Sequence, residues 1–142
     1  MKSIIYIKAS ANHGKTEIIC KIYEKLKEFD YKDDEKFKTI NENSGNKEYK
    51  DILRVVVKGD IRIGIASCGD PSENHKKWLD ILCSENCDII ICACRTRGRT
   101  LQTIEAIKDY DKYGFIPSHN KKSNNKDNIS LFYHIIKFFI KS

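Results

Sequence analysis

The residues from Ala9 to Thr16 have the types and spacing needed to hold a phosphate group. The run reads Ala9-Ser10-Ala11-Asn12-His13-Gly14-Lys15-Thr16, with Ala at the first position of a pattern that usually begins with Gly. A loop between a strand and a helix turns successive backbone N–H groups toward an anion. Gly14 allows close backbone approach, Lys15 reaches the outer phosphates, and the Thr16 hydroxyl can ligate Mg²⁺. The alternative is an ordinary strand–turn–helix connection.

The segments on either side of this loop favour phosphate binding. Residues 2–8 form a short β-rich run. Residues 16–29 carry apolar side chains at helical spacing, namely Ile18, Ile19, Ile22, Leu26 and Phe29. The loop therefore follows a predicted strand and opens a predicted helix, which is the context that a phosphate-binding loop requires.

The remaining segments predict an α/β domain. Residues 52–57 and 61–66 are β-rich runs joined by a three-residue turn with Gly59, which predicts an antiparallel hairpin. The other predictions are helices at 70–84, 100–110 and 129–140, a buried strand at 88–93, and polar loops at 30–51 and 117–128. This order predicts one domain over residues 1–142, with a mostly parallel sheet, one antiparallel hairpin strand and helices on both faces.

On the loop and its context, the chain resembles the P-loop NTPase superfamily. The specific resemblance covers residues 1–16, and the order of elements extends it to about residue 110. The runs Ile63-Gly-Ile-Ala-Ser-Cys-Gly-Asp70 and Cys87-Asp-Ile-Ile-Ile-Cys-Ala-Cys-Arg-Thr-Arg-Gly98 are also similar to small uncharacterised bacterial ATP-binding proteins. The resemblance implies a nucleoside triphosphate bound with Mg²⁺ by residues 9–16, and turnover as a minimal NTPase or a phosphotransferase.

The resemblance also implies an acidic residue that follows a hydrophobic strand and holds the magnesium water shell. Asp70 is the counterpart in this sequence, so we expect Thr16 and Asp70 at the metal. The run Asp70-Pro71-Ser72-Glu73 equally fits a capping box that starts a helix. Ser67, three residues earlier, either contacts phosphate or bonds to the backbone of its own turn.

The absence of two motifs limits which nucleotide base the protein is expected to bind. No DxxG follows the strand that ends at Ala66, and no NKxD follows a later strand. The sequence therefore lacks the guanine-reading residues, and ATP is expected rather than GTP. No Asp or Glu ends the strand at 89–93, which argues against a water-orienting base at that place and against efficient hydrolysis.

Arginines follow the predicted strand at 88–93, where open α/β sheets bind ligands. Together with Lys15, Arg95 and Arg97 are the expected catalytic residues, because an arginine can stabilise the charge that develops on a transferred phosphoryl group. The same side chains could contact a phosphorylated acceptor or a nucleic-acid backbone. The alternative is a solvated basic loop without a ligand.

Composition limits the remaining classes. The chain has 142 residues, a net charge of +6, and 32% charged against 40% hydrophobic residues, which excludes fibrous and wholly disordered chains. No apolar run approaches the ~20 residues of a membrane span, so we expect a cytoplasmic protein with no membrane partner.

Residues 95–142 hold 10 Lys or Arg and 4 Asp or Glu. This basic end leaves open a second function, in which a non-catalytic, nucleotide-regulated module binds nucleic acid or a partner protein. A homodimer also stays open.

The sequence contains six cysteines, without the C-x-x-C pairs of zinc ribbons. Free Cys commonly behaves as a small buried hydrophobe. We expect reduced structural cysteines rather than a metal site or a disulfide framework.

Overall fold

One mixed β-sheet joins the strands of the computed structural model, which describes residues 2–10, 14–42, 50–118 and 125–141. In chain order the elements are β1 (Ser3–Lys8), α1 (Lys15–Glu28), β2 (Lys32–Asp33), β3 (Ile40–Glu42), β4 (Asp51–Lys58), β5 (Ile61–Ala66), α2 (Glu73–Ser84), β6 (Ile89–Cys94), α3 (Arg99–Glu105), β7 (Asp111–Phe115) and α4 (Lys126–Lys141). Within these ranges, no helix has the length and apolar character needed to cross a bilayer. The protein is an α/β domain, as its sequence predicts.

The sheet brings four parallel strands together. Its order is β2-β4-β5-β6-β1-β7, and β3 pairs with the first residues of β4. β5, β6, β1 and β7 are mutually parallel, whereas β4 is antiparallel to β5, with Leu53 opposite Ala66. The predicted hairpin is therefore confirmed. Because β4 runs the other way, its first residue lies at the edge of the sheet where the parallel strands end.

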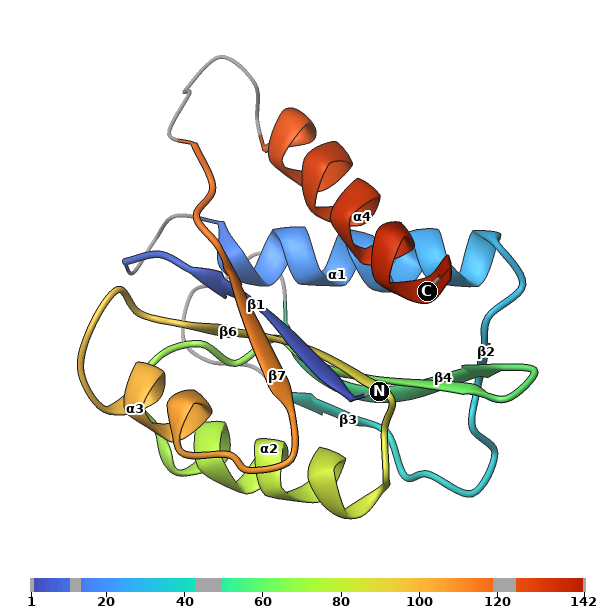
Figure 1. Ribbon diagram of the computed structural model, residues 1–142, viewed down its shortest axis with the longest axis horizontal. Helices are drawn as coiled ribbons and strands as arrows, with labels where there is room; N and C mark the ends of the chain where they lie inside the picture. The colour runs from blue at the N-terminus through green and yellow to red at the C-terminus, as the bar shows by residue number, and fades with distance from the viewer. Residues whose placement is uncertain (1, 11–13, 43–49, 119–124, 142) are drawn as a thin grey trace.

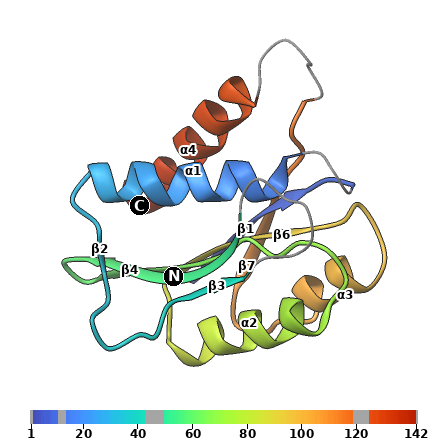
Figure 2. The ribbon, with the colours of Figure 1, turned by 180° about the vertical axis from the view of Figure 1, so that it is seen from behind.

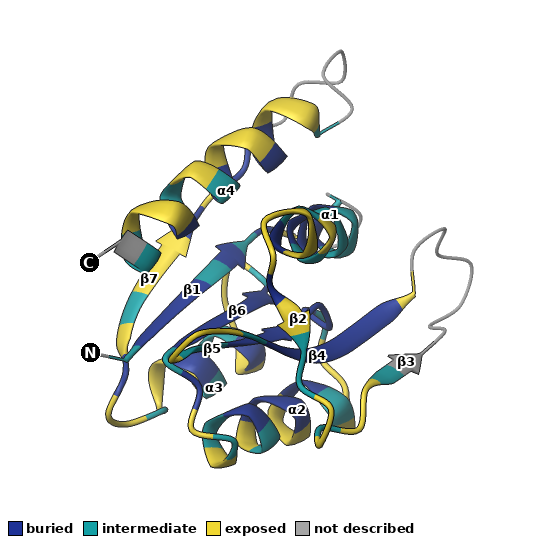
Figure 3. Cartoon of the chain, turned by 90° about the vertical axis from the view of Figure 1, so that its right-hand side faces the viewer, coloured by how far each residue is buried: buried dark blue, intermediate teal, exposed yellow. Residues whose placement is uncertain are grey.

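Helices cover both faces of the sheet, as predicted. α1 and α4 lie on one face, and α2 and α3 lie on the other (Figure 3). Side chains alternate between the faces along β1: Ile5 and Ile7 join the core under α1 and α4, while Ile4 joins the core over α2 and α3. All six residues of β6 are buried, which explains why its sequence is an almost continuous apolar run.

The last strand of the sheet was not predicted. The sequence pattern extends a helix over residues 100–110, but α3 ends at Glu105, and residues 111–115 form β7 beside β1. β7 is an edge strand with mostly exposed or half-buried side chains, so it lacks an apolar pattern. Gly114 leaves room there for Tyr6, because a Cβ would lie 2.9 Å from Cζ of the Tyr6 ring. The partner strand, rather than local propensity, decides this element.

The polar segment 30–51 also differs from the predicted loop. β2 and β3 lie within it, and both pair antiparallel with β4. Residues 43–49, in the stretch expected to be an exposed loop, lie outside the described residues. The predicted terminal helix is present and begins earlier than expected, at Lys126.

Candidate phosphate-binding site

β1 and β6 are adjacent and parallel, yet the helices that follow them diverge. The chain leaves β1 for α1 on one face of the sheet and leaves β6 for α3 on the other, as Figure 1 and the reverse view in Figure 2 show. Ligands of open α/β sheets bind at such a switch point, outside the carboxyl ends of the strands. The segments 9–16, 67–70 and 95–98 all follow strands that end at this edge.

The loop between β1 and α1 is anchored at both ends. The N–H of Ala9 donates to the carbonyl of Cys94 at 3.1 Å and extends the pairing of β1 with β6, while Ser10 is exposed. Gly14 has φ 77° at the start of α1, a conformation that favours glycine. Ala11, Asn12 and His13, which the sequence assigns to nucleotide binding, lie outside the described residues.

Lys15 is the first residue of α1 and is only 6% exposed. Its Nζ donates to the carbonyl of Ala9 at 3.0 Å and pairs with Oδ1 of Asp70 at 3.3 Å. Burial lowers the pKa of Lys15, and the charge of Asp70 opposes that shift. Gly69 makes room for this arrangement, since a Cβ there would lie 3.2 Å from Cε of Lys15. The ammonium group is thus held at the carboxyl edge of β1 beside the helix N-terminus.

Asp70 lies between two cations. Its Oδ1 accepts from Nε of Arg95 at 3.2 Å as well as from Lys15, and its side chain is about one-third exposed, at 33%. The capping-box interpretation of Asp70 is wrong, because α2 begins at Glu73 with Ser72 at its N-cap position. The helix starts later in the chain than the capping box requires, and Oδ1 of Asp70 instead makes charge-assisted contacts with two cations. The structure therefore brings together three of the residues that the sequence selects.

The other arginines of this segment lie farther out. Arg97 and Arg99 are exposed, and Gly98 between them has φ 96° as α3 begins. The backbone N–H of Arg95 donates to Oγ1 of Thr100 at 3.0 Å, which fixes the start of the segment against α3. Arg95 thus has a defined position at the site, whereas Arg97 is a solvent-facing residue of the same loop.

Thr16 contacts a carboxylate that the sequence analysis did not select. Its Oγ1 donates to Oδ1 of Asp51 at 3.1 Å. The same oxygen accepts from Oγ of Ser67 at 3.1 Å, and Ser67 Oγ accepts from the N–H of Ile52 at 2.8 Å. Asp51 is 4% exposed. The sequence pattern does not select Asp51 as a site residue, because Asp51 stands at the end of a polar segment. The signal for it is an acidic residue at the start of a strand that runs antiparallel to the strands ending at the site.

A buried histidine ties α2 to the end of β6. His75 is 3% exposed, and its Nε2 donates to the carbonyl of Ala93 at 2.9 Å. Burial lowers the pKa of His75, and the charge of Lys15 adds to that shift while the bond to Ala93 opposes it. A cavity of about 350 Å³ lies beside it, between the first turns of α2 and α3, lined by Ser72, Glu73, His75, Lys76, Arg99, Thr100 and Thr103.

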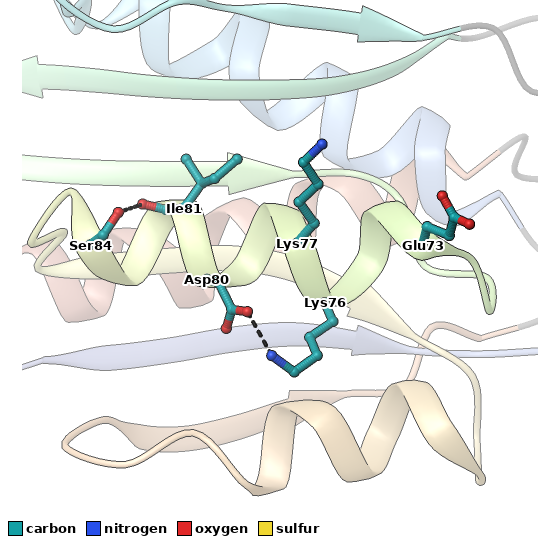
Figure 4. A pocket seen from close by; sticks show the side chains of 6 residues that line it. All are labelled: Glu73, Lys76, Lys77, Asp80, Ile81 and Ser84. Carbon is teal, nitrogen blue, oxygen red and sulfur yellow. Dashed lines mark hydrogen bonds and ion pairs between the residues drawn. The ribbon is translucent and has the colours of Figure 1, made fainter.

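A second hollow of about 490 Å³ lies along the exposed side of α2 (Figure 4). Side chains of this one helix line it, and they bond among themselves. Lys76 pairs with Asp80 at 2.7 Å, and Oγ of Ser84 donates to the carbonyl of Ile81 at 2.7 Å. The hollow is therefore the surface relief of a solvated helix, and it contributes nothing to the site.

Five of the six cysteines, all except Cys20, lie in or against the core over α2 and α3. No disulfide joins them, and burial raises the thiol pKa of Cys20 and Cys94 to about 11 and that of Cys87 to about 12. Within the described ranges, no group of three His, Cys, Asp or Glu side chains has the arrangement of a metal site. The cysteines pack as small apolar side chains.

Comparison of the chain with protein-family models, with curated proteins and with solved structures finds no match. The site is therefore defined by the residues of this chain alone. They define an α/β domain in which a buried lysine, an arginine and two aspartates meet the first turn of a helix at the carboxyl edge of a mixed sheet.

Proposed function

We propose that this protein binds a nucleoside triphosphate, ATP, together with Mg²⁺, on the loop between β1 and α1. We further propose that it turns the nucleotide over as a minimal NTPase or as a phosphotransferase. The observation that supports this most is the position of Lys15. Its ammonium group is almost fully buried at the N-terminus of α1 and shares Oδ1 of Asp70 with Arg95. Burying a lysine costs free energy. At this place the buried ammonium group is in position to bind a phosphate.

The two cations converge on one anionic oxygen. A phosphate oxygen at the position of Asp70 Oδ1 would meet the same Nζ of Lys15 and Nε of Arg95. The first backbone N–H groups of α1 have no partner within the helix and add positive potential. A terminal phosphate placed here is therefore bound by the helix N-terminus, a lysine and an arginine, each of which favours negative charge.

Each residue then has a role in phosphoryl transfer. Lys15 neutralises charge on the outer phosphates, and Arg95 meets the charge that develops as the terminal phosphoryl group departs. Arg97 joins from the exposed part of the same loop. Mg²⁺, when bound, would supply positive charge that offsets the charge of the phosphates. The Thr16 hydroxyl and a nearby carboxylate supply the oxygen donors that Mg²⁺ prefers, and Thr16 Oγ1 lies 3.1 Å from a carboxylate oxygen.

The cavity beside His75 favours transfer to an acceptor over transfer to water. It lies next to the segment that holds Arg95, since Thr100 both lines it and bonds to the N–H of Arg95. Arg99 and Lys76 give it cationic groups, and Glu73 gives it one carboxylate. An anionic small molecule in this space would lie near the phosphate edge of the sheet.

Titration calorimetry tests the proposal. ATP and GTP are titrated into the full chain in EDTA and then in Mg²⁺, and turnover is measured with the nucleotide that binds. We expect Lys15→Met, which keeps most of the side-chain volume, to abolish binding. Lys21→Met is the matched control on the same helix, because Lys21 is 41% exposed and pairs with Glu24 one turn away on the helix surface. If Lys15→Met binds ATP as tightly as the wild type, the proposed function is wrong.

Tight binding without turnover would favour the second candidate, a nucleotide-regulated binding module. The observation in favour of that candidate is the state of Asp70. A carboxylate held by two cations is a weak base for activating water.

A further inference from the structure

Two aspartates at the phosphate edge have different surroundings. Asp70 contacts the cations Lys15 and Arg95. Asp51 contacts two hydroxyls, those of Thr16 and Ser67, through one oxygen. The two carboxylates come from separate elements, because Asp51 begins β4 and Asp70 follows β5. The edge thus carries one acidic side chain that is bonded to two cations and one that is bonded to two hydroxyl groups.

A divalent cation favours the second environment. An ion at Asp70 would come close to the charges of Lys15 and Arg95, and like charges a few ångströms apart repel strongly where water is partly excluded. An ion beside Asp51 would meet the oxygens of its carboxylate and of the Thr16 hydroxyl. The Thr16 hydroxyl lies 3.1 Å from the Asp51 carboxylate, so the two groups would together hold one ion. Mg²⁺ usually keeps several waters and takes one or two protein oxygen groups together with substrate phosphates.

Ser67 fixes the direction of the Asp51 carboxylate. Its hydroxyl donates to Asp51 Oδ1 at 3.1 Å and accepts from the backbone N–H of Ile52 at 2.8 Å. Ser67 is fully buried, so this chain of bonds is shielded from water. Outer groups that orient a metal-binding carboxylate typically change metal affinity by about 10–100-fold when they are removed.

We propose that Asp51, with Thr16, is the acidic residue of the magnesium site, and that Ser67 is the residue that positions it. This assignment rests on the proposed function, since the ion is bound together with a nucleotide. The sequence favours Asp70 as the acidic residue at the metal. The assignment gives that role instead to Asp51, the first residue of the antiparallel strand β4. Asp70 then neutralises the phosphate-binding cations while no nucleotide is present.

The test compares Asp51→Asn with Asp70→Asn in the full chain. Asn has the shape of Asp, and its side-chain oxygen can still accept from both hydroxyls. ATP affinity is measured by calorimetry in EDTA and in Mg²⁺, and the ratio of the two affinities is the readout. We expect Asp51→Asn to keep the EDTA affinity and to lose about tenfold or more of the gain from Mg²⁺. Asp70→Asn should keep that gain.

Ser67→Ala is the second variant, and thermal unfolding checks that each chain folds. It leaves the Asp51 carboxylate in place but removes the bond that directs it, so part of the Mg²⁺ gain should be lost at unchanged EDTA affinity. A full Mg²⁺ gain in both Asp51→Asn and Ser67→Ala overturns the assignment. So does loss of the gain in Asp70→Asn alone. If Asp51→Asn does not fold, the Ser67→Ala result decides. A wild-type chain that binds no ATP in either buffer refutes the proposed function itself.

Discussion

Lys15 and Asp70 lie 55 residues apart in the chain and form an ion pair of 3.3 Å between Nζ and Oδ1. The pair links the first residue of α1 to the segment after β5, across the edge where β5, β6 and β1 end. Lys15 is buried and Asp70 is only partly exposed. The carboxylate therefore lies where it offsets the charge of the lysine, and a phosphate that binds Lys15 must compete with it.

That competition predicts the behaviour of Asp70→Asn in the absence of metal. Removing the negative charge leaves Lys15 and Arg95 without their shared carboxylate, so affinity for ATP in EDTA should rise. We expect a gain of about two- to fivefold, the size that partly exposed ion pairs provide. Calorimetry in EDTA measures it. A lower affinity in this variant would show that Asp70 assists nucleotide binding.

Removing either arginine should lower the turnover rate more than it lowers the affinity for ATP. Arg95 has a fixed position beside Asp70, so Arg95→Ala should lower turnover by about tenfold or more and change ATP affinity less. Arg97 is exposed, and Arg97→Ala should cause a smaller loss. Steady-state turnover and calorimetry provide the two quantities. If Arg95→Ala lowers turnover and ATP affinity equally, Arg95 contributes to binding of the nucleotide but not to stabilisation of the transition state.

The same variants test the nucleic-acid alternative. Affinity of the wild type for a single-stranded oligonucleotide is measured by fluorescence anisotropy over a range of salt concentrations. If the basic loop binds a phosphate backbone, affinity falls steeply with salt, and each arginine removed lowers the slope by about one unit or less. We expect weak binding that is unchanged in Arg95→Ala, because that side chain is paired with Asp70.

His75 should make stability depend on pH in the acidic range. Burial lowers its pKa from the ordinary value of 6.5, so the unfolded chain binds the proton more tightly than the folded protein. The free energy of unfolding should therefore be independent of this group above pH 6.5 and fall as the pH drops from 6.5 toward the lowered pKa.

Urea unfolding as a function of pH measures this dependence. His75→Gln should flatten the loss of stability below pH 6.5, since Gln gains no charge and can still donate to the Ala93 carbonyl. His134→Gln, at an exposed position of α4, is the matched control and should retain the wild-type profile. An unchanged acidic slope in His75→Gln would mean that other groups cause it.

Gly114 should be sensitive to a single methyl group. A Cβ at this position would lie 2.9 Å from Cζ of Tyr6 and 3.0 Å from the Tyr6 hydroxyl. Gly114→Ala should therefore push the Tyr6 ring off its preferred rotamer and destabilise the fold by about 0.5–1.5 kcal/mol. Thermal or urea unfolding measures the loss. The double variant Tyr6→Leu/Gly114→Ala should recover part of it, because the ring that clashes is gone. Additive losses would contradict this cause.

Local sequence patterns determined much of the framework. The spacing of Ile18, Ile22 and Leu26 predicts α1, and these side chains are fully buried in the core. The short turn at Gly59 predicts the β4–β5 hairpin, which the structure confirms with a two-residue turn, since Lys58 pairs with Ile61. The apolar run of β6 predicts a strand covered on both faces. In each case the determining contacts lie within one element or one turn, so the pattern carries the information.

Only the tertiary structure shows that residues 111–115 form the strand β7 and which groups surround Asp51 and Asp70. β7 has no apolar pattern of its own, and its pairing with β1 makes it a strand. Asp70 has the sequence of a helix cap, but two cations from other segments draw its carboxylate away. Asp51 reaches Thr16 only because β4 runs antiparallel to β5. These outcomes depend on contacts between residues far apart in the chain, where strand order and direction decide which side chains share an edge.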